Sequence, residues 1–441
     1  MLLKYFTDPL LMSSMWGTIL MCLSTSLIGT LAFIRRESLI GETLSHAAFP
    51  GAVIGVMLSM TFFPSNDTAS LFILIASAFL FSLLGMGVVV LLIKQFKLKE
   101  DSALCFVLST FVGVGVFIAS ILQTLHPLWF RQVSSFFYGQ AATLMNIHVV
   151  SYAVLSLSIL LFVVMTFPKL KIANFDTEFA KSVGLEVIRL NLAILVFFSL
   201  AVVIGIKAVG VVLMSGMLIA PALAARAWTH KLSIMFILSS CFGILSAILG
   251  NILSYEIPKY YSGSFSLPTG PLILLIAALF SLLSLFFAPK KGLVYRFCRV
   301  KNFQKQCVEE NFVKSFWKNG LTKQVTLSEA MSIFHLPKLK TWCLLFLLTQ
   351  KKDLFKEAGN WGLTEKGKKR AAHIVRVHRL FELYLSSKLN VKGDMIHEIA
   401  EEMEHYITLD LEKELTQELS DPKRDPHSQP IPKTNFRGEV S

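Results

Sequence analysis

Six residues with metal-ligating side chains lie at helical spacing near the end of the chain: His378, Glu382, His397, Glu401, Glu404 and His405. The first two are four residues apart, as are the third and fourth. Such residues share one face of a helix. Two helices with these faces opposed would offer imidazole and carboxylate ligands to one or two divalent transition-metal ions. The alternative reading is a set of ordinary surface ion pairs.

A second candidate pair lies near the start of the chain, within the segment from Gly41 to Gly51. Glu42 and His46 are four residues apart and therefore share a helix face. Ionisable groups at a membrane boundary are costly and suggest a function, and this pair suits Mn, Fe or Zn. The alternative is a plain helix start, with Glu42 near the positive end of the dipole and His46 at the interface.

Long apolar runs show which part of the chain lies in a membrane, and Glu42 and His46 fall within that part. A helix needs about 20 apolar residues to cross a membrane. Nine runs meet or approach that length: 11–34, 44–63, 70–93, 103–122, 148–167, 190–206, 208–225, 232–253 and 270–288. The first lacks a basic leader and a small-residue cleavage site, so we expect a retained helix.

Composition changes near residue 289. The 441-residue chain is 54% hydrophobic and 16% charged, against roughly 25% charged in soluble proteins. The net charge of +13 divides into +5 before residue 290 and +8 after it. The basic second part suits nucleic acid, an anionic membrane surface, or simply a soluble domain beside a membrane. The six cysteines form no CxxC pair, which argues against a disulfide framework or a zinc knuckle.

Lysine and arginine in the short loops set the orientation. The loops after the first, third, fifth and seventh spans carry most of them, for example Arg35, Lys97 and Lys181. Positive loops face the cytoplasm. The segment after Pro289 is therefore expected in the cytoplasm.

Two further stretches of the membrane part carry information. In the loop 168–189, Asp176 and Thr177 are expected to cap a short helix that Gly184 ends. That helix would be either a docking knob for a soluble partner or an ordinary surface helix. Between Gly210 and Arg226, small residues allow close helix approach, and Pro221 frees a backbone carbonyl that is tolerable where it faces protein or a water-filled path. The alternative is tight packing without transport.

The polar part begins with an expected helix over Glu309–Trp317. Leu327–Phe334 and Pro337–Leu348 then read as a helix-turn-helix, with Lys338 and Lys340 able to contact phosphates. Residues 342–348 form a continuous apolar run, whereas a helix that contacts DNA bases normally keeps one polar face. This run therefore favours the alternative, a helix that packs in a buried core. The lysine-, tryptophan- and leucine-bearing segment 351–366 is expected to form a small wing.

The membrane part resembles the permease subunit of ATP-driven importers of zinc, manganese or iron. The resemblance covers about 1–288 and rests on Glu42, Ser45, His46, Ala47, Pro50 and Gly51, on the loop residues Phe175, Asp176, Glu178, Phe179, Ala180 and Gly184, and on the Gly210–Arg226 helix. It implies a pore with a second permease subunit, an ABC ATPase docked on the loop, and an extracytoplasmic metal-binding lipoprotein. The family's usual acidic residue is Asp, where this chain has Glu42. No Walker-type phosphate loop is present, so the chain is expected not to be an enzyme.

The polar part resembles the diphtheria-toxin-repressor family of metal-dependent repressors, from about Glu309 to Pro432. The resemblance rests on 378–383, on 397–405 and on the Asp-Pro-His…Pro-Ile-Pro tail at 425–432. It implies one metal site on His378, Glu382 and His397. A second would use Glu401, Glu404 and His405, completed from the first helix. Glu401 stands where iron-type members carry Cys, as in manganese-type members. The first-helix ligand position falls on Asn311, with Glu310 as the substitute.

Taken together, the sequence predicts an all-α protein: a polytopic bundle of about nine spans, then a winged helix-turn-helix and a helical metal-binding and dimerisation region. The expected divisions are 1–289, a basic linker 290–308, 309–370 and 371–441. The expected function is a permease for divalent iron or manganese, with zinc as a third candidate, fused to a repressor that uses the same ion as corepressor and binds operator DNA. It would be a multi-pass protein of the cell inner membrane, with its cytoplasmic part open to release by proteolysis at the linker.

Two rival readings remain from the sequence. One is a secondary metal transporter with a cytoplasmic metal-sensing gate and no DNA role, although the spans hold few charges beyond Glu42 and His46. The other makes 290–441 a degenerate domain that dimerises or restrains the pore.

Overall fold

A computed structural model describes residues 4–63, 67–261, 267–318, 320, 324–334, 337–388 and 395–433. The chain divides into two compact units, Met1–Arg296 and Phe297–Ser441. Each unit is considered by itself below. Over the described residues the protein is almost entirely helical, with one two-stranded sheet.

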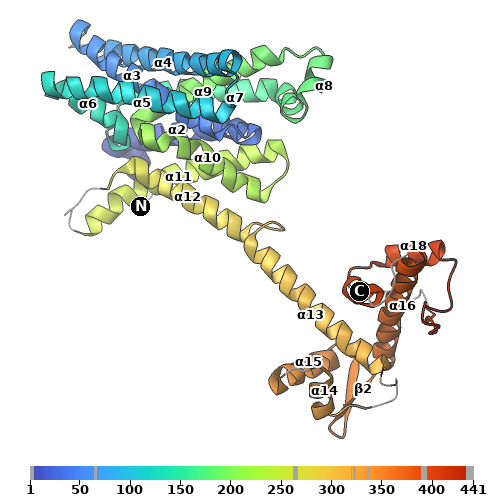
Figure 1. Ribbon diagram of the computed structural model, residues 1–441. Helices are drawn as coiled ribbons and strands as arrows, with labels where there is room; N and C mark the ends of the chain where they lie inside the picture. Colours follow the sequence, from blue (N-terminus) through green and yellow to red (C-terminus); the bar gives the residue numbers. More distant parts are fainter. Residues whose placement is uncertain are drawn as a thin grey trace. The chain divides into compact units, whose positions relative to one another are not determined.

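Nine long apolar helices fill the described part of the first unit, as the sequence predicts (Figure 1). They are α2 (Pro9–Arg35), α3 (Ser38–Phe62), α4 (Asp67–Phe96), α5 (Glu100–Leu125), α7 (Asn146–Phe175), α9 (Val187–Val209), α10 (Val211–Trp228), α11 (Leu232–Tyr260) and α12 (Thr269–Phe287). Short elements join them: α1 (Lys4–Thr7), α6 (Pro127–Tyr138), η1 (Ala141–Thr143) and α8 (Thr177–Ser182). Every backbone polar group must be satisfied inside the segment in lipid, so helices are the natural solution here.

Helices α2 and α3 are mostly buried, whereas only 22% of the apolar window of α4 and of α5 is buried. Close approach of small residues joins the inner helices. A Cβ atom at Gly29 of α2 would lie 2.0 Å from the backbone oxygen of Leu218 on α10. A Cβ atom at Gly243 of α11 would lie 2.1 Å from Ser26 Oγ on α2. Small residues at these crossings allow the dispersion contacts that hold helices together in a membrane.

The segment 168–189 contains less loop than the sequence suggested. Helix α7 continues through Pro168 and ends at Phe175, so only the short helix α8 and its flanks connect it to α9. The predicted cap is confirmed: Asp176 accepts hydrogen bonds from the backbone N–H groups of Glu178 and Phe179, at 3.1 and 2.9 Å. Gly184 ends the turn with a φ of 81°, a conformation that suits glycine.

The second unit begins within the long helix α13 (Leu293–Lys318) and continues with α14 (Leu327–Phe334), α15 (Lys338–Gln350), β1 (Leu354–Glu357), β2 (Asn360–Leu363), α16 (Glu365–Ser387), α17 (Met395–Met403) and α18 (Leu409–Glu418). The segment predicted as a basic linker is therefore helical from Leu293 onward. Its physical reason is that 293–318 contains neither Gly nor Pro, so nothing interrupts a helix there.

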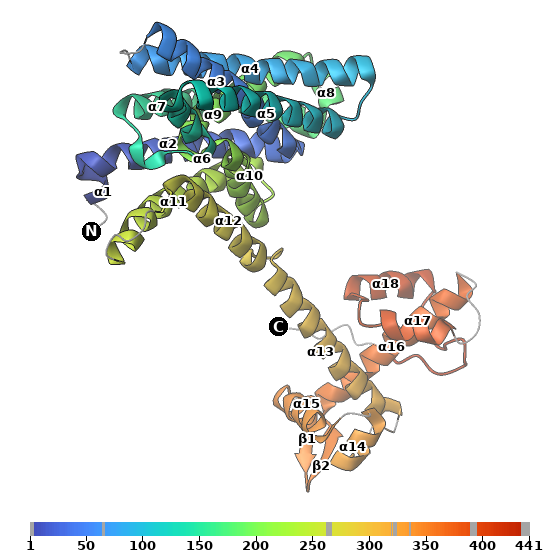
Figure 2. The same ribbon diagram turned by 60° about the vertical axis from the view of Figure 1, so that its left-hand side comes forward.

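The predicted helix-turn-helix and wing are both present (Figure 2). Thr326 and Glu329 form a reciprocal capping box at the start of α14. Strands β1 and β2 pair antiparallel through the turn residues Ala358 and Gly359, whose φ values of 49° and 86° match the turn that a tight hairpin requires. Phe312, Leu345, Leu348, Trp361 and their neighbours form one apolar core beneath these elements.

Candidate metal centre

Helices α16 and α17 bring the predicted ligands together. Helix α16 begins at Thr364, whose hydroxyl accepts a hydrogen bond from the Gly367 N–H, and it carries His378 and Glu382 one turn apart. Helix α17 packs against it through the buried Ile396 and Ala400. This packing places His397 beside the α16 pair.

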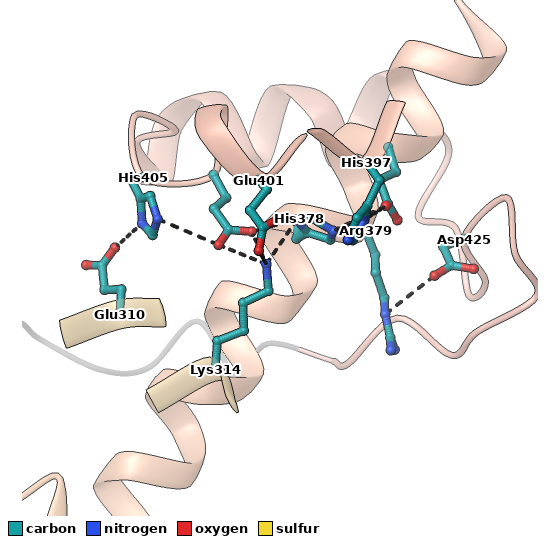
Figure 3. A network of polar contacts seen from close by, with 10 residues as sticks. Glu310, Lys314, His378, Arg379, His397, Glu401, His405 and Asp425 are labelled. Carbon is teal, nitrogen blue, oxygen red and sulfur yellow. Dashed lines mark hydrogen bonds and ion pairs between the residues drawn. The ribbon is translucent and has the colours of Figure 1, made fainter. Parts of the chain in front are cut away.

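His378, Glu382 and His397 form a compact ligand set (Figure 3). One ligand atom from each lies within 4.8 Å of the others. Glu382 Oε1 is 2.8 Å from His397 Nδ1 and 3.2 Å from His378 Nε2, and those two ring nitrogens are 3.2 Å apart. Two imidazoles and a carboxylate are a donor set that suits a divalent transition metal. We call these three residues the triad.

The triad is electrostatically prepared for a cation. His378 and Glu382 are buried, whereas half of the His397 side chain is exposed. Burial raises the pKa of Glu382, but hydrogen bonds from the two histidines outweigh it and lower that pKa to about 2. The Glu382 carboxyl is thus ionised at neutral pH, as a metal ligand must be.

A second polar cluster lies on the other side of His378, around the fully buried Glu404. His378 Nδ1 is 2.6 Å from Glu404 Oε2. The ammonium group of Lys314, from α13, lies 2.7 and 2.9 Å from the two oxygens of Glu404 and 3.3 Å from His378 Nδ1. Glu401 Oε1 is 3.9 Å from the same ammonium group. We call Lys314, Glu401 and Glu404 the lysine cluster.

His405 connects this region to α13. Its Nδ1 is 2.7 Å from Glu310 Oε2, while its buried Nε2 has no hydrogen-bond partner and lies 3.8 Å from Glu404 Oε1. Asn311 makes no such contact, since its buried Oδ1 has no hydrogen-bond partner. Of the two first-helix residues considered from the sequence, Glu310 is the one that reaches the predicted ligands.

Sequence reasoning missed Lys314. The signal was present, because Lys314 follows Glu310 by four residues and therefore shares its helix face. A lysine is not a metal ligand, however, and a search for ligand-type side chains passes over it. Only the packing of α13 against α16 and α17 reveals its role.

Buried arginines fix α16 against the rest of the unit. Arg376 Nε is 3.1 Å from Glu412 Oε1 on α18, and Arg376 also donates to the Pro432 carbonyl. Arg379 contacts Asp425, whose carboxylate accepts from two backbone N–H groups of the tail (Figure 3). The tail motif noticed in the sequence thus closes over α16 through these contacts.

The predicted transport pair lies on α3, distant in sequence from the triad and in the other unit. Glu42 and His46 are both half-buried. Between them, Ser45 donates a hydrogen bond to the Glu42 backbone oxygen, and the following residues from Ala47 to Pro50 are buried against neighbouring helices.

The predicted coupling residues surround α8. Ala180 is buried in a small apolar cluster that holds α8 between α7 and α9. In contrast, Phe175 and Phe179 are exposed by 75% and 54%. Phe175 ends α7 and Phe179 lies on α8, so the two exposed aromatic side chains flank the Asp176 cap.

The second helix of the helix-turn-helix, α15, has one buried face and one exposed face. Lys338 and Lys340 are exposed at the start of α15. The apolar run 342–348 serves both faces: Leu344, Leu345 and Leu348 are buried in the core, whereas Trp342 and Phe346 are exposed and stacked on one another. The prediction of a packing helix is therefore right for one face of α15 only.

Two family models match the chain. Residues 7–288 match the ABC 3 transport family, and residues 364–433 match the metal binding and dimerisation domain of the iron dependent repressor. The second match contains the triad and the predicted residues Glu401, Glu404 and His405.

Several characterised chains are similar over long stretches. A probable metal transport system membrane protein of Chlamydia trachomatis is 37% identical over the whole of both chains. The manganese transport system membrane protein MntC of Bacillus subtilis is 32% identical, covering 86% of this chain and 85% of its own. The zinc transport system membrane protein TroC of Treponema pallidum is 33% identical, covering 68% and 95%. A solved PsaBC structure from Streptococcus pneumoniae shares the fold at a TM-score of 0.57 and 24% identity, covering 68% of this chain and 97% of that one.

Proposed function

This chain belongs to the ABC 3 transport family, and we propose that it is the permease of an ATP-driven importer of a divalent transition metal, with a cytoplasmic repressor that senses the same metal. The observation that carries the proposal is the triad, two of whose three residues are buried, in a chain whose other part matches an ABC 3 permease. One polypeptide would then both admit an ion and report its abundance.

The import path is assigned to the pair on α3. Glu42 and His46 share one helix face and are only half-buried, so both side chains have access to a path between helices. A carboxylate and an imidazole provide a weak, incomplete shell for a transition metal. An incomplete shell suits transport, because an ion that is held by few ligands can also leave.

ATP binding and hydrolysis are assigned to a separate ABC ATPase subunit docked on α8. Phe175 and Phe179 would enter a pocket of that subunit, while the Asp176 cap and the buried Ala180 keep α8 attached to α7 and α9. Movement of the ATPase would thereby move two spans. A second permease subunit and an extracytoplasmic metal-binding protein complete the proposed importer.

The regulatory role is assigned to the triad. A divalent ion bound there would supply the positive charge that joins α16 and α17. His378 and Glu382 hold fixed positions on α16, while the exposed His397 closes from α17. Ordering of these helices would position the helix-turn-helix of a dimer on operator DNA, with Lys338 and Lys340 contacting phosphates.

We place Mn²⁺ and Fe²⁺ first as substrate and corepressor, with Zn²⁺ as the third candidate. Carboxylate ligands favour Mn²⁺, whereas imidazole accepts Mn²⁺, Fe²⁺ and Zn²⁺. Two similar permeases are named for manganese and for zinc.

We place the protein in the cell inner membrane with its second unit in the cytoplasm, because the positively charged loops lie on that side. A repressor held at a membrane reaches little DNA, so we propose release by proteolysis. Proteases cleave extended backbone, and between α12 and α13 only residues 288–292 lie outside a helix. The proposed cleavage site is therefore narrower than the basic linker 290–308.

One experiment tests the proposal against both rivals. The full chain and its ATPase are produced together, and uptake of radioactive Mn²⁺ and binding to the operon's own promoter DNA are measured. Uptake that requires ATPase activity excludes a secondary transporter. DNA binding that requires Mn²⁺ excludes a domain that only restrains the pore. Metal-independent DNA binding, or uptake without the ATPase, would contradict the proposal.

A further inference from the structure

The lysine cluster places the ammonium group of Lys314 between two carboxylates that could otherwise bind a metal ion. The Lys314 ammonium group is within 2.9 Å of both Glu404 oxygens and 3.9 Å of Glu401. These two carboxylates are among the residues that the family resemblance assigns to the second metal. We infer that the Lys314 ammonium group takes the place of that second metal. The domain then binds one ion, at the triad. This inference rests on the proposed metal-sensing role.

Burial makes this arrangement a fixed part of the fold. The Lys314 side chain is 5% exposed and that of Glu404 is fully buried. A buried charge must be paired, and removal of one partner leaves an uncompensated charge in the interior. The ammonium group supplies three donors, two of which reach the Glu404 oxygens, and the Glu401 carboxylate lies 3.9 Å away. Its positive charge is therefore satisfied where it lies.

The remaining geometry also favours one ion. Within the described residues, the triad is the one group of three or more metal-ligating side chains with all ligand atoms within 4.8 Å of one another. Both Glu404 oxygens are already engaged by Lys314. His405 is directed to Glu310 through Nδ1, at 2.7 Å, and among the described residues its Nε2 makes no hydrogen bond and lies 3.8 Å from Glu404 Oε1.

The lysine cluster also prepares the triad through His378. Lys314 keeps Glu404 ionised, and Glu404 accepts the Nδ1 hydrogen of His378. A hydrogen on Nδ1 leaves Nε2 as the nitrogen that faces Glu382 and His397 and binds the metal.

The test counts metal rather than activity. The full chain in detergent is dialysed to equilibrium against Mn²⁺, and bound manganese per chain is measured by elemental analysis. The number of bound ions in each variant is compared with that in the wild type, so that ions bound elsewhere on the chain cancel. We expect His397→Ala to bind one ion fewer. His405→Ala should bind the same number as the wild type, and Lys314→Met should bind one ion more. Adding His405→Ala to Lys314→Met should remove the extra ion.

Two results would overturn the inference: one ion fewer in His405→Ala alone, or no extra ion in a folded Lys314→Met chain. Folding is checked by protease resistance of a C-terminal epitope. If Lys314→Met does not fold, the His405→Ala comparison still decides. Lys305→Met removes an exposed lysine from the same helix and serves as the control. An unchanged count in His397→Ala would instead contradict the proposed triad, so the two failures are distinguishable.

Discussion

Arg376 and Glu412 form a buried ion pair that joins α16 to α18. The Nε–Oε1 distance is 3.1 Å, and both side chains are at most 5% exposed. The pair lies within one turn of His378, on the helix that carries two of the three triad residues. Packing of α16 therefore depends on a charge that is satisfied from outside the metal centre.

Removal of one partner should destabilise the second unit strongly. We expect Arg376→Ala to cost roughly 3–5 kcal/mol in the free energy of unfolding, because the buried Glu412 then loses its guanidinium partner and keeps only the His373 imidazole, 3.4 Å from its Oε2. Pulse proteolysis in urea, read with a C-terminal epitope, measures the change. Lys413→Ala breaks only an exposed contact with Asp410 and should change stability by less than about 1 kcal/mol. If both variants lowered the free energy of unfolding equally, the buried ion pair would contribute no more to stability than the exposed one.

The triad should determine metal affinity. Loss of a residue that merely orients a ligand typically weakens binding 10- to 100-fold, so we expect Glu382→Ala to weaken Mn²⁺ binding by about 100-fold or more. Isothermal titration of the full chain provides the dissociation constant. Glu398→Ala removes an exposed carboxylate beside His397 and should leave it unchanged. Wild-type affinity in Glu382→Ala would place the ion elsewhere.

Import should depend on the α3 pair. We expect Glu42→Ala combined with His46→Ala to reduce uptake of radioactive Mn²⁺ to background, since no ligand then remains on that helix face. The complex with the ATPase should still assemble. His126→Ala removes an exposed imidazole from the same unit and should transport normally. Normal uptake by the double variant would take both residues out of the path.

The exposed face of α8 should hold the ATPase. Phe179→Asp places a charge on an apolar contact and should abolish copurification of the ATPase, with uptake lost in parallel. Phe179→Leu preserves the apolar surface and should retain both. Copurification of the ATPase with the Asp variant at wild-type yield would argue for docking elsewhere.

DNA binding should show two phosphate contacts at the start of α15. The double variant Lys338→Ala, Lys340→Ala should bind promoter DNA more weakly. Its slope of log K against log salt concentration should be smaller by roughly 2, about 1 for each lost contact. Fluorescence anisotropy across a salt series measures both quantities. Lys305→Ala, on α13, is the control, and an unchanged slope in the double variant would remove α15 from the phosphate backbone.

Local pattern was sufficient for most of the fold. Apolar runs of membrane length predicted the nine long helices, and Asp176 correctly marked the start of α8. The start of α13 was not predicted, because the first helix of the polar part was expected over Glu309–Trp317 and the structure begins it at Leu293. Helix α13 begins there because charge does not prevent a helix when Gly and Pro are absent.

The site was predictable only in part. Spacing alone grouped His378 with Glu382, because four residues make one helical turn. Which cation meets Glu404 depends on the packing of α13, α16 and α17, and no local pattern encodes that. Lys314 is 90 residues from Glu404 in sequence, and only the folded unit brings the two together.

The uneven exposure of the triad has a kinetic consequence. Two ligands are embedded in the protein, while the His397 ring borders on water. An ion held at the proposed site would therefore depart by rotation of one side chain, without opening the interior. A detector built in this way empties soon after the supply of its ion declines, and its response follows scarcity as readily as abundance.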